Sequence, residues 1–186
     1  MDFFKNGGVI WITGLAGSGK SYIAEALYKK LKEKYNNIIY LDGDELRDLL
    51  EHYGYDKQSR IDMSIKRSKF AHFLSSQNML VIVSAISMWN EIYEHNKKTL
   101  KNYFEIYIKC DFEELKKRDK KNLYSKNLKG EISNVVGMDI DFDEPKSNLI
   151  IDNTYMTELD NKISYILTAL KEKKIKKKAC KIFYSI

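Results

Sequence analysis

The sequence predicts a single α/β domain built on a parallel sheet. Short apolar runs alternate along the chain with helical patterns, a rhythm typical of parallel strands with helices on both faces. The length of 186 residues is close to that of one domain. No repeat, Gly/Ser-rich linker or low-complexity segment divides the chain before its Lys-rich end. We therefore expect one domain over residues 1–170, followed by a tail at residues 171–186.

Five strands and five main helices are expected in alternation. The strand of residues 79–86 is the most apolar and is expected at the centre of the sheet. Residues 121–145 are polar with little periodicity, and so long a segment inside a compact domain is typical of a functional lid or of disorder; we expect a lid. The strands are expected at 9–13, 37–41, 79–86, 103–110 and 148–152, and the helices at 21–35, 57–77, 90–100, 112–120 and 156–171.

Composition excludes several classes of protein. Hydrophobic residues make up 44% of the chain, enough to offset ordering entropy by burial, so global disorder is excluded. No apolar run approaches the roughly 20 residues of a membrane-spanning helix, and the N-terminus lacks the features of a signal peptide. Cys110 and Cys180 match no metal-ligand spacing and form no disulfide framework. These observations predict a cytoplasmic protein without a membrane span.

The positive charge is confined to the tail. Residues 171–186 contain seven Lys and one Glu, which accounts for the whole net charge of +6. The remaining residues carry equal numbers of basic and acidic side chains, so the basic pI is no sign of a nucleic-acid partner. We expect a small-molecule partner.

A phosphate-binding loop follows the first expected strand. The segment fits the pattern G-x-x-x-x-G-K-[ST] and opens a helix, as the mechanism demands. Backbone amides curled by glycine, together with the helix N-terminus, would hold phosphate groups of ATP. Lys20 would neutralise the β and γ phosphates, and Ser21 would ligate Mg²⁺. The loop comprises Gly14, Leu15, Ala16, Gly17, Ser18, Gly19, Lys20 and Ser21.

The remaining motifs favour a small-molecule kinase over a switch protein. Neither N-K-x-D nor D-x-x-G, which a GTPase would need, occurs in the chain. Two acids, Asp42 and Asp44, directly follow the second expected strand, whose carboxyl end should open onto the substrate crevice. Asp44 is therefore the candidate for accepting the hydroxyl proton of the acceptor or for orienting Mg²⁺. The alternative is that these acids only cap the next helix.

From residue 9 to residue 153, the chain resembles the adenylylsulfate kinase family in the order and spacing of its motifs. This resemblance implies the P-loop kinase three-layer sandwich with a five-stranded parallel sheet and a lid. It also implies a phosphotransferase with an alcohol acceptor, which passes the γ-phosphoryl group of ATP to the 3′-hydroxyl of a 5′-activated nucleotide. The motifs are GLAGSGKS, LDGDELR, GY at Gly54, Arg60, AIS at Ala85, KRD, LYSK, GEI and VGMDIDFDEP.

The resemblance also implies residue roles. Asp44 becomes the catalytic carboxylate, with Lys20 as the second catalytic residue, and Asp44 and Ser21 bind Mg²⁺ together. Arg118 would lie over the ATP side and help to close the lid. Family members are commonly homodimers. The implied acceptor-binding residues are Asp42, Arg47, Tyr55, Arg60, Ile86, Ser87 and, from the lid, Lys126.

Departures from the family pattern gather in the acceptor pocket. Glu45 and Met63 stand where the family usually has Asn, and residues 85–90 read AISMWN instead of Phe-Ile-Ser-Pro followed by an aromatic residue and Arg. The usual lid Phe is replaced by Val135 or Val136, so that Tyr55 supplies one of the two aromatic faces that usually hold the acceptor base. Losing one stacking face would cost a purine more than a pyrimidine.

These departures indicate a changed acceptor. The sequence is similar to a branch of the family that phosphorylates cytidine diphosphoramidate in capsule phosphoramidate biosynthesis, and this acceptor is favoured over adenylyl sulfate. Two other interpretations remain open: a kinase of a small metabolite such as a sugar acid, and a regulatory protein that binds nucleotide without catalysis.

Overall fold

A five-stranded parallel sheet forms the middle layer of the structure, a computed structural model that describes residues 6–155 and 158–182. The strand order is β2-β3-β1-β4-β5. The strands are β1 (Gly8–Thr13), β2 (Ile38–Asp42), β3 (Leu80–Ala85), β4 (Tyr103–Lys109) and β5 (Leu149–Asp152). The expected P-loop kinase architecture is confirmed.

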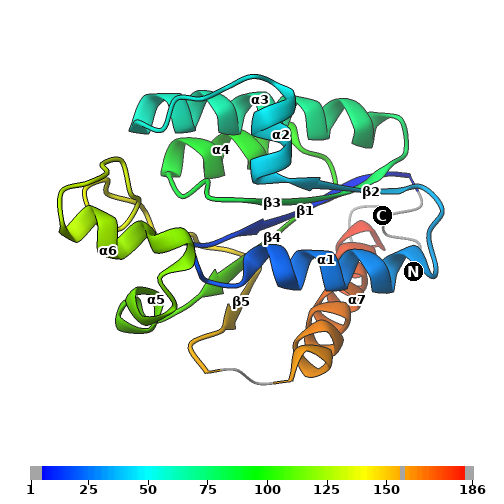
Figure 1. Cartoon of the computed structure of the whole chain (residues 1–186). Coiled ribbons are helices and arrows are strands. Elements are labelled where there is room, and N and C mark those ends of the chain that lie inside the picture. The colour runs from blue at the N-terminus through cyan, green and yellow to red at the C-terminus, as the bar shows by residue number, and fades with distance from the viewer. Residues whose placement is uncertain (1–5, 156–157, 183–186) are drawn as a thin grey trace.

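Helices cover both faces of the sheet (Figure 1). One face carries α2 (Gly43–Leu49), α3 (Lys57–Ser76) and α4 (Asn90–Thr99), and the opposite face carries α1 (Lys20–Lys32) and α7 (Leu159–Ile182). Two further helices, α5 (Phe112–Arg118) and α6 (Leu123–Leu128), lie toward one end of the sheet. None of the described helices is both long and apolar enough to cross a membrane.

The middle strand is β1, not the strand expected there. β3 is interior, but it lies between β2 and β1. All residues of β1 and all residues of β3 are buried, because helices cover both faces of each strand. Apolarity alone therefore cannot rank two interior strands, which is why the prediction for residues 79–86 was wrong.

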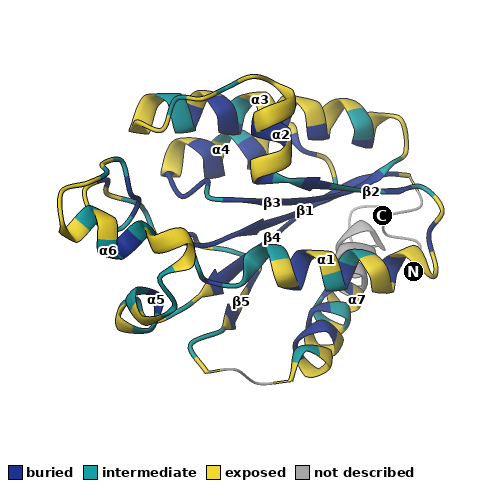
Figure 2. Cartoon of the chain, in the orientation of Figure 1, coloured by how far each residue is buried: buried dark blue, intermediate teal, exposed yellow. Residues whose placement is uncertain are grey.

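Two apolar cores hold the layers together, one on each face of the sheet (Figure 2). On the α1 side, Ile23 and Leu27 pack in one cluster with Ile10 and Ile12 of β1. This pattern follows from the spacing of apolar residues along an amphipathic helix. On the opposite side, Trp11 of β1 belongs to the cluster that also contains buried residues of α3, α4 and the lid segment.

The register brings the carboxyl ends of three strands into line. Thr13 pairs with Ala85, and Asp42 pairs with Ser84. The loop before α1, the start of α2 and the segment after β3 therefore all leave the sheet at the same edge. In open α/β sheets, ligands bind in the crevice at this edge.

The expected lid of residues 121–145 is folded against the body. It contains α6 and begins within a short 3₁₀ turn, η2 (Lys120–Asn122). Tyr124, Val135 and Val136 are buried, and Trp89 donates from Nε1 to the carbonyl of Asp141 at 3.0 Å. α6 gave no periodic signal in the sequence, because a six-residue helix is too short to show one.

The last helix is longer than expected. α7 runs from Leu159 to Ile182, so it crosses the boundary at residue 170 that the sequence suggested between domain and tail. Residues 156 and 157, with which the expected helix began, lie outside the described residues, as do 183–186 of the tail.

Candidate active site

The loop between β1 and α1 has the backbone geometry of a phosphate cradle. Gly17 and Gly19 adopt left-handed φ angles of 78° and 90°, which other residues adopt only with strain. A Cβ atom at Gly19 would also lie 2.4 Å from Nδ2 of Asn153. That amide donates to the carbonyl of Ser18 at 2.7 Å and so fixes the loop from behind. The structure thus explains why this turn needs glycine.

Two further side chains brace the same loop. Arg118 donates to the carbonyls of Gly17, Asn153 and Thr154 at 3.3, 2.8 and 2.9 Å. Tyr124 of α6 donates from its hydroxyl to the carbonyl of Ala16 at 2.8 Å. Arg118 therefore lies beside the phosphate loop, as expected, but the structure ties its guanidinium to protein atoms.

Lys20 occupies a cationic environment at the start of α1. Its Nζ lies 3.5 Å from the carbonyl of Leu15. Burial and the charge of Lys120 lower the pKa of Lys20 to about 8, against the opposing influence of Asp44 and Asp42. An anion bound here would favour the charged ammonium form and raise this pKa again.

The two acids after β2 have different surroundings. Asp42 caps α2 by accepting the N–H of Asp44 at 2.9 Å, and it also accepts the hydroxyl of Tyr40 at 2.9 Å. Asp42 therefore caps α2, but it also lines the cavity described below, so capping is not its only contact. The carboxylate of Asp44 pairs instead with Lys121 at 3.1 Å. Burial would raise the pKa of Asp44, but the hydrogen bond and charge of Lys121 and the charge of Lys20 outweigh burial and lower it.

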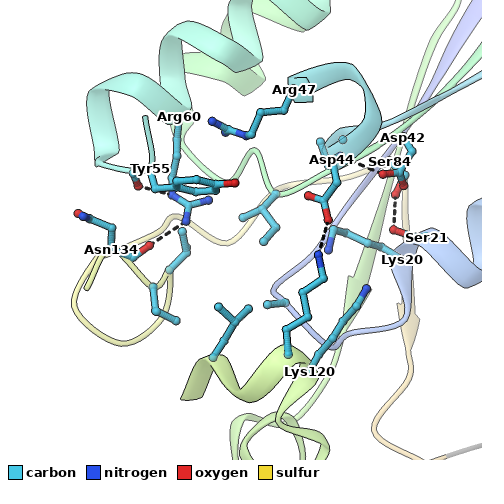
Figure 3. A pocket seen from close by; sticks show the side chains of 18 of the residues that line it. Lys20, Ser21, Asp42, Asp44, Arg47, Tyr55, Arg60, Ser84, Lys120 and Asn134 are labelled. Atoms are coloured by element: carbon cyan, nitrogen blue, oxygen red, sulfur yellow. Dashed lines mark hydrogen bonds and ion pairs between the residues drawn. The ribbon is translucent and has the colours of Figure 1, made fainter. Parts of the chain in front are cut away.

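Lys20 and Asp44 line a single cavity of about 530 Å³ at the carboxyl edge of the sheet (Figure 3). The phosphate loop contributes Ala16, Lys20 and Ser21, and Oγ of Ser21 lies 3.2 Å from Oγ of Ser84. The structure therefore brings the phosphate loop and the acid pair, which are far apart in sequence, to one place.

An aromatic ring and two arginines form the far side of this cavity. Arg47 donates from Nη1 to the carbonyls of His52 and Gly54 at 3.0 and 2.6 Å. Arg60 donates from Nε to the carbonyl of Tyr55 at 2.6 Å, and from Nη2 to that of Asn134 in the lid at 2.7 Å. The guanidinium carbons of Arg47 and Arg60 lie 4.7 and 5.3 Å from the ring centre of Tyr55. These contacts hold the three side chains in a fixed, cationic wall.

Two of the expected acceptor-binding residues, Ser87 and Lys126, do not line the cavity, whereas Ile86 does. Ser87 is fully buried, and its hydroxyl accepts a hydrogen bond from Ser64 at 3.0 Å. Lys126 is exposed on α6 and lies outside the lining. Lys120 and Lys121, at the start of the lid, line the cavity instead.

Sequence reasoning missed three basic residues of the cavity. Arg67 lies seven positions after Arg60, a spacing that puts both on one face of α3, and this signal could have been found. Lys120 and Lys121 had no such signal. They lie where the chain turns through left-handed conformations at Asp119, Lys121 and Asn122. Because none of these residues is glycine, the sequence does not indicate the turn.

The oxygen atoms of the cavity fit a magnesium ion shared with phosphate. Mg²⁺ is usually held by one or two carboxylates, substrate phosphates and water, not by a full protein cage. The hydroxyl of Ser21 and the carboxylates of Asp44 and Asp42 line the cavity with Lys20. Among the residues that the structure describes, no group of three or more His, Cys, Asp or Glu side chains could hold a metal by itself.

The lowered pKa of Lys20 predicts a pH dependence of ATP binding. Free protein loses the Lys20 proton as the pH rises through about 8, whereas bound phosphate keeps the ammonium charged. Binding then takes up a proton, so we expect ATP affinity to fall above about pH 8, approaching tenfold per pH unit. Calorimetric titration with ATP between pH 7 and 10 measures this. Lys20→Ala should lose this component, and an unchanged pH profile in that variant would contradict the assignment.

Comparisons with known proteins agree on one family. The family model described as adenylylsulphate kinase matches residues 6–152. The chain is 60% identical over 162 residues to a cytidine diphosphoramidate kinase of Campylobacter jejuni, covering 87% of this chain and 95% of that protein. It is 37% identical over 147 residues to a probable adenylyl-sulfate kinase of Archaeoglobus fulgidus, covering 78% and 95%.

A solved structure supports the same assignment. The APS kinase of Mycobacterium tuberculosis in complex with AMPPNP and APS superposes with a TM-score of 0.80 at 31% identity. The match covers 89% of this chain and 98% of that one. Together with the family match and the kinase relatives, it confirms the expectation of a phosphotransferase that acts on a hydroxyl group. The chain belongs to the adenylylsulphate kinase family.

Proposed function

We propose that this protein uses Mg-ATP to phosphorylate the ribose 3′-hydroxyl of cytidine diphosphoramidate. The observation that carries the kinase chemistry is the shared cavity, in which Lys20 and Asp44 lie opposite a wall of arginines (Figure 3). The acceptor is supported by the name of the Campylobacter jejuni relative, at 60% identity.

The chemistry follows from the placement of the two residues. Loop amides and Lys20 hold the ATP phosphates, while Asp44 accepts the proton of the ribose hydroxyl as its oxygen attacks the γ phosphorus. One P–O bond forms at the 3′ oxygen, and the bond to the β–γ bridging oxygen breaks, releasing ADP. Ser21 and Asp44 would hold Mg²⁺, which neutralises phosphate charge when bound.

The wall of Arg47, Arg60 and Tyr55 suits a nucleotide with acidic groups on its 5′ side. Guanidinium groups bind phosphate oxygens with directional, charge-assisted hydrogen bonds, and this positioning sets where the 3′-hydroxyl meets the γ-phosphate. Asp42 and Ile86 border the same space. The proposed contact of Lys126 requires movement of the lid, since its side chain lies outside the cavity lining.

The base pocket favours a pyrimidine. The half-exposed ring of Tyr55 lines the cavity together with Val135 and Val136, two aliphatic residues where a second aromatic face would lie. Stacking of a base on an aromatic side chain contributes about 1 to 3 kcal/mol. A purine gains more from a second aromatic face than a pyrimidine does, so its absence costs adenosine more.

Adenylyl sulfate is the second candidate acceptor. It is supported by the adenylyl-sulfate kinase of Clostridium acetobutylicum, 36% identical over 173 residues, and by the Mycobacterium tuberculosis complex with APS. Because both acceptors present a ribose 3′-hydroxyl and an acidic 5′ side, the phosphate chemistry is the same for both. Only the base and the terminal 5′ group differ.

A direct comparison of acceptors tests the proposal. We expect kcat/KM for cytidine diphosphoramidate to exceed that for adenylyl sulfate at least about tenfold, as the loss of one stacking face implies. Coupled ADP release with each acceptor at saturating Mg-ATP measures this. A preference for adenylyl sulfate would replace the proposed acceptor with the second candidate. Tight ATP binding without product from either acceptor would favour a non-catalytic role.

A further inference from the structure

A third arginine lies in the cavity without a counter-ion. Arg67 of α3 lines the cavity and is only 3% exposed. Its Nη2 donates to the carbonyl of Gly43 at 3.1 Å, but its Nε is buried and has no hydrogen-bond partner. Among the residues that the structure describes, no carboxylate forms an ion pair with it.

This arrangement is costly for the protein alone. A buried guanidinium needs both a compensating charge and partners for its N–H groups. Burial and the charge of Arg47 lower the pKa of Arg67 to about 10, and the charges of Asp42 and Asp44 offset this only in part. Such unsatisfied groups in a cleft are characteristic of binding sites, where a ligand supplies what is missing.

The charge balance of the cavity indicates which kind of ligand is missing. Six cationic side chains line it against three carboxylates, namely Lys20, Arg47, Arg60, Arg67, Lys120 and Lys121 against Asp42, Asp44 and Asp48. Lys20 faces the ATP phosphates, the charge of Lys120 acts on Lys20, and Lys121 pairs with Asp44, so these three cations and the pair Asp42 and Asp44 are assigned to the phosphate and proton-transfer side. The acceptor side keeps the remaining three arginines against Asp48.

Arg67 differs from Arg60 in what its donors already bind. Arg60 uses both Nε and Nη2 on backbone carbonyls, whereas the Nε of Arg67 remains unused. The guanidinium of Arg67 bonds to the carbonyl of Gly43, at the start of α2. Arg67 therefore lines the cavity with a buried charge that no carboxylate compensates and with an Nε that no protein atom satisfies.

We propose that Arg67 binds an anionic group on the 5′ side of the acceptor nucleotide and so determines acceptor binding together with Arg47 and Arg60. An anion is favoured over the base, because a neutral base would satisfy the N–H groups but leave the buried charge uncompensated. The proposal rests on the proposed function in taking the acceptor to be a nucleotide, but it does not depend on which base the nucleotide carries.

Competition binding with matched ligands tests the proposal. Cytidine 5′-diphosphate and cytidine share base and ribose, and differ only in the 5′ phosphates. We expect Arg67→Gln to weaken binding of the diphosphate about 10- to 100-fold, as expected for one charge-assisted contact, while cytidine changes less than about threefold. The KM for ATP and the Tm should stay near wild type. Arg67→Lys keeps the charge but loses the planar guanidinium, so its affinity for the diphosphate should lie between that of the wild type and that of Arg67→Gln.

Controls separate this role from the alternatives. Lys66→Gln removes an exposed charge from the same helix and should change none of these values. Equal losses for the diphosphate and cytidine would overturn the proposal in favour of a base contact. An unchanged affinity for both ligands, or a fall in Tm together with a raised KM for ATP, would overturn it in favour of a structural role. If Arg67→Gln does not fold, the same comparison with Arg67→Lys decides.

The same design distinguishes failure of this inference from failure of the proposed function. Adenylyl sulfate and adenosine are titrated in parallel. If wild-type protein binds only the adenosine pair, the proposed acceptor is wrong, and the Arg67 variants are then compared on that pair. A selective loss for adenylyl sulfate would still support anion binding by Arg67.

Discussion

Asp44→Asn is expected to lower kcat about 10²- to 10⁴-fold, the range that a general base contributes. The amide is nearly the same size as the carboxylate, but it cannot accept the proton of the acceptor hydroxyl. ATP affinity should change only a fewfold, because Lys20 and the loop amides hold the phosphates. Single-turnover phosphoryl transfer, measured beside ATP titration, tests both parts of this expectation.

The fold should tolerate this change. The ion pair of Asp44 with Lys121 has side chains 75% and 66% exposed, and pairs of this kind contribute little to stability. Glu51→Gln, which removes an exposed carboxylate outside the cavity lining, is the matched control and should retain full turnover. Near wild-type turnover of Asp44→Asn would show that another group accepts the proton.

Lys20→Ala is expected to lower kcat/KM for ATP about 10²- to 10³-fold, through both a lower kcat and a higher KM. Removing one preorganised cation from a transferring phosphate has an effect of this size. Steady-state kinetics over a wide range of ATP concentration measures the two parameters separately. An effect on KM alone would restrict Lys20 to ground-state binding.

Loss of folding should not cause this effect. The pKa of Lys20 is lowered in the folded protein, so keeping the charged ammonium in place at neutral pH costs stability, and alanine removes that cost. The expected Tm is therefore equal to that of the wild type or higher. Lys29→Ala, which breaks an exposed ion pair with Glu25 on the same helix, is the control and should leave activity intact.

The phosphate side of the site could be predicted from sequence because its determinants are local. The glycines, Lys20 and Ser21 lie within eight residues, and the geometry of a strand, a tight turn and a helix fixes their relative positions. The carboxyl edge of a parallel sheet then places Asp42 and Asp44 nearby, since every strand ends on the same side.

The acceptor side was harder to predict because its determinants are distant. Whether Lys121 or Lys126 reaches the cavity depends on left-handed turns before α6. The burial of Ser87 depends on its contact with Ser64 of α3, which no local pattern encodes. The order of interior strands, likewise, is set by packing across the whole sheet. The homodimer implied by the family resemblance stays a prediction.

The crowding at Gly19 has a consequence for how acceptor preference can change. Replacing Gly19 would require both a strained φ angle and displacement of Asn153, whose amide supports the loop. The acceptor side is lined at Ala85, Val135 and Val136 by aliphatic side chains in ordinary backbone conformations, so substitutions there reshape the space without disturbing the ATP phosphates. Point substitutions on the acceptor side can therefore change the substrate, whereas steric crowding at the phosphate loop opposes substitution there.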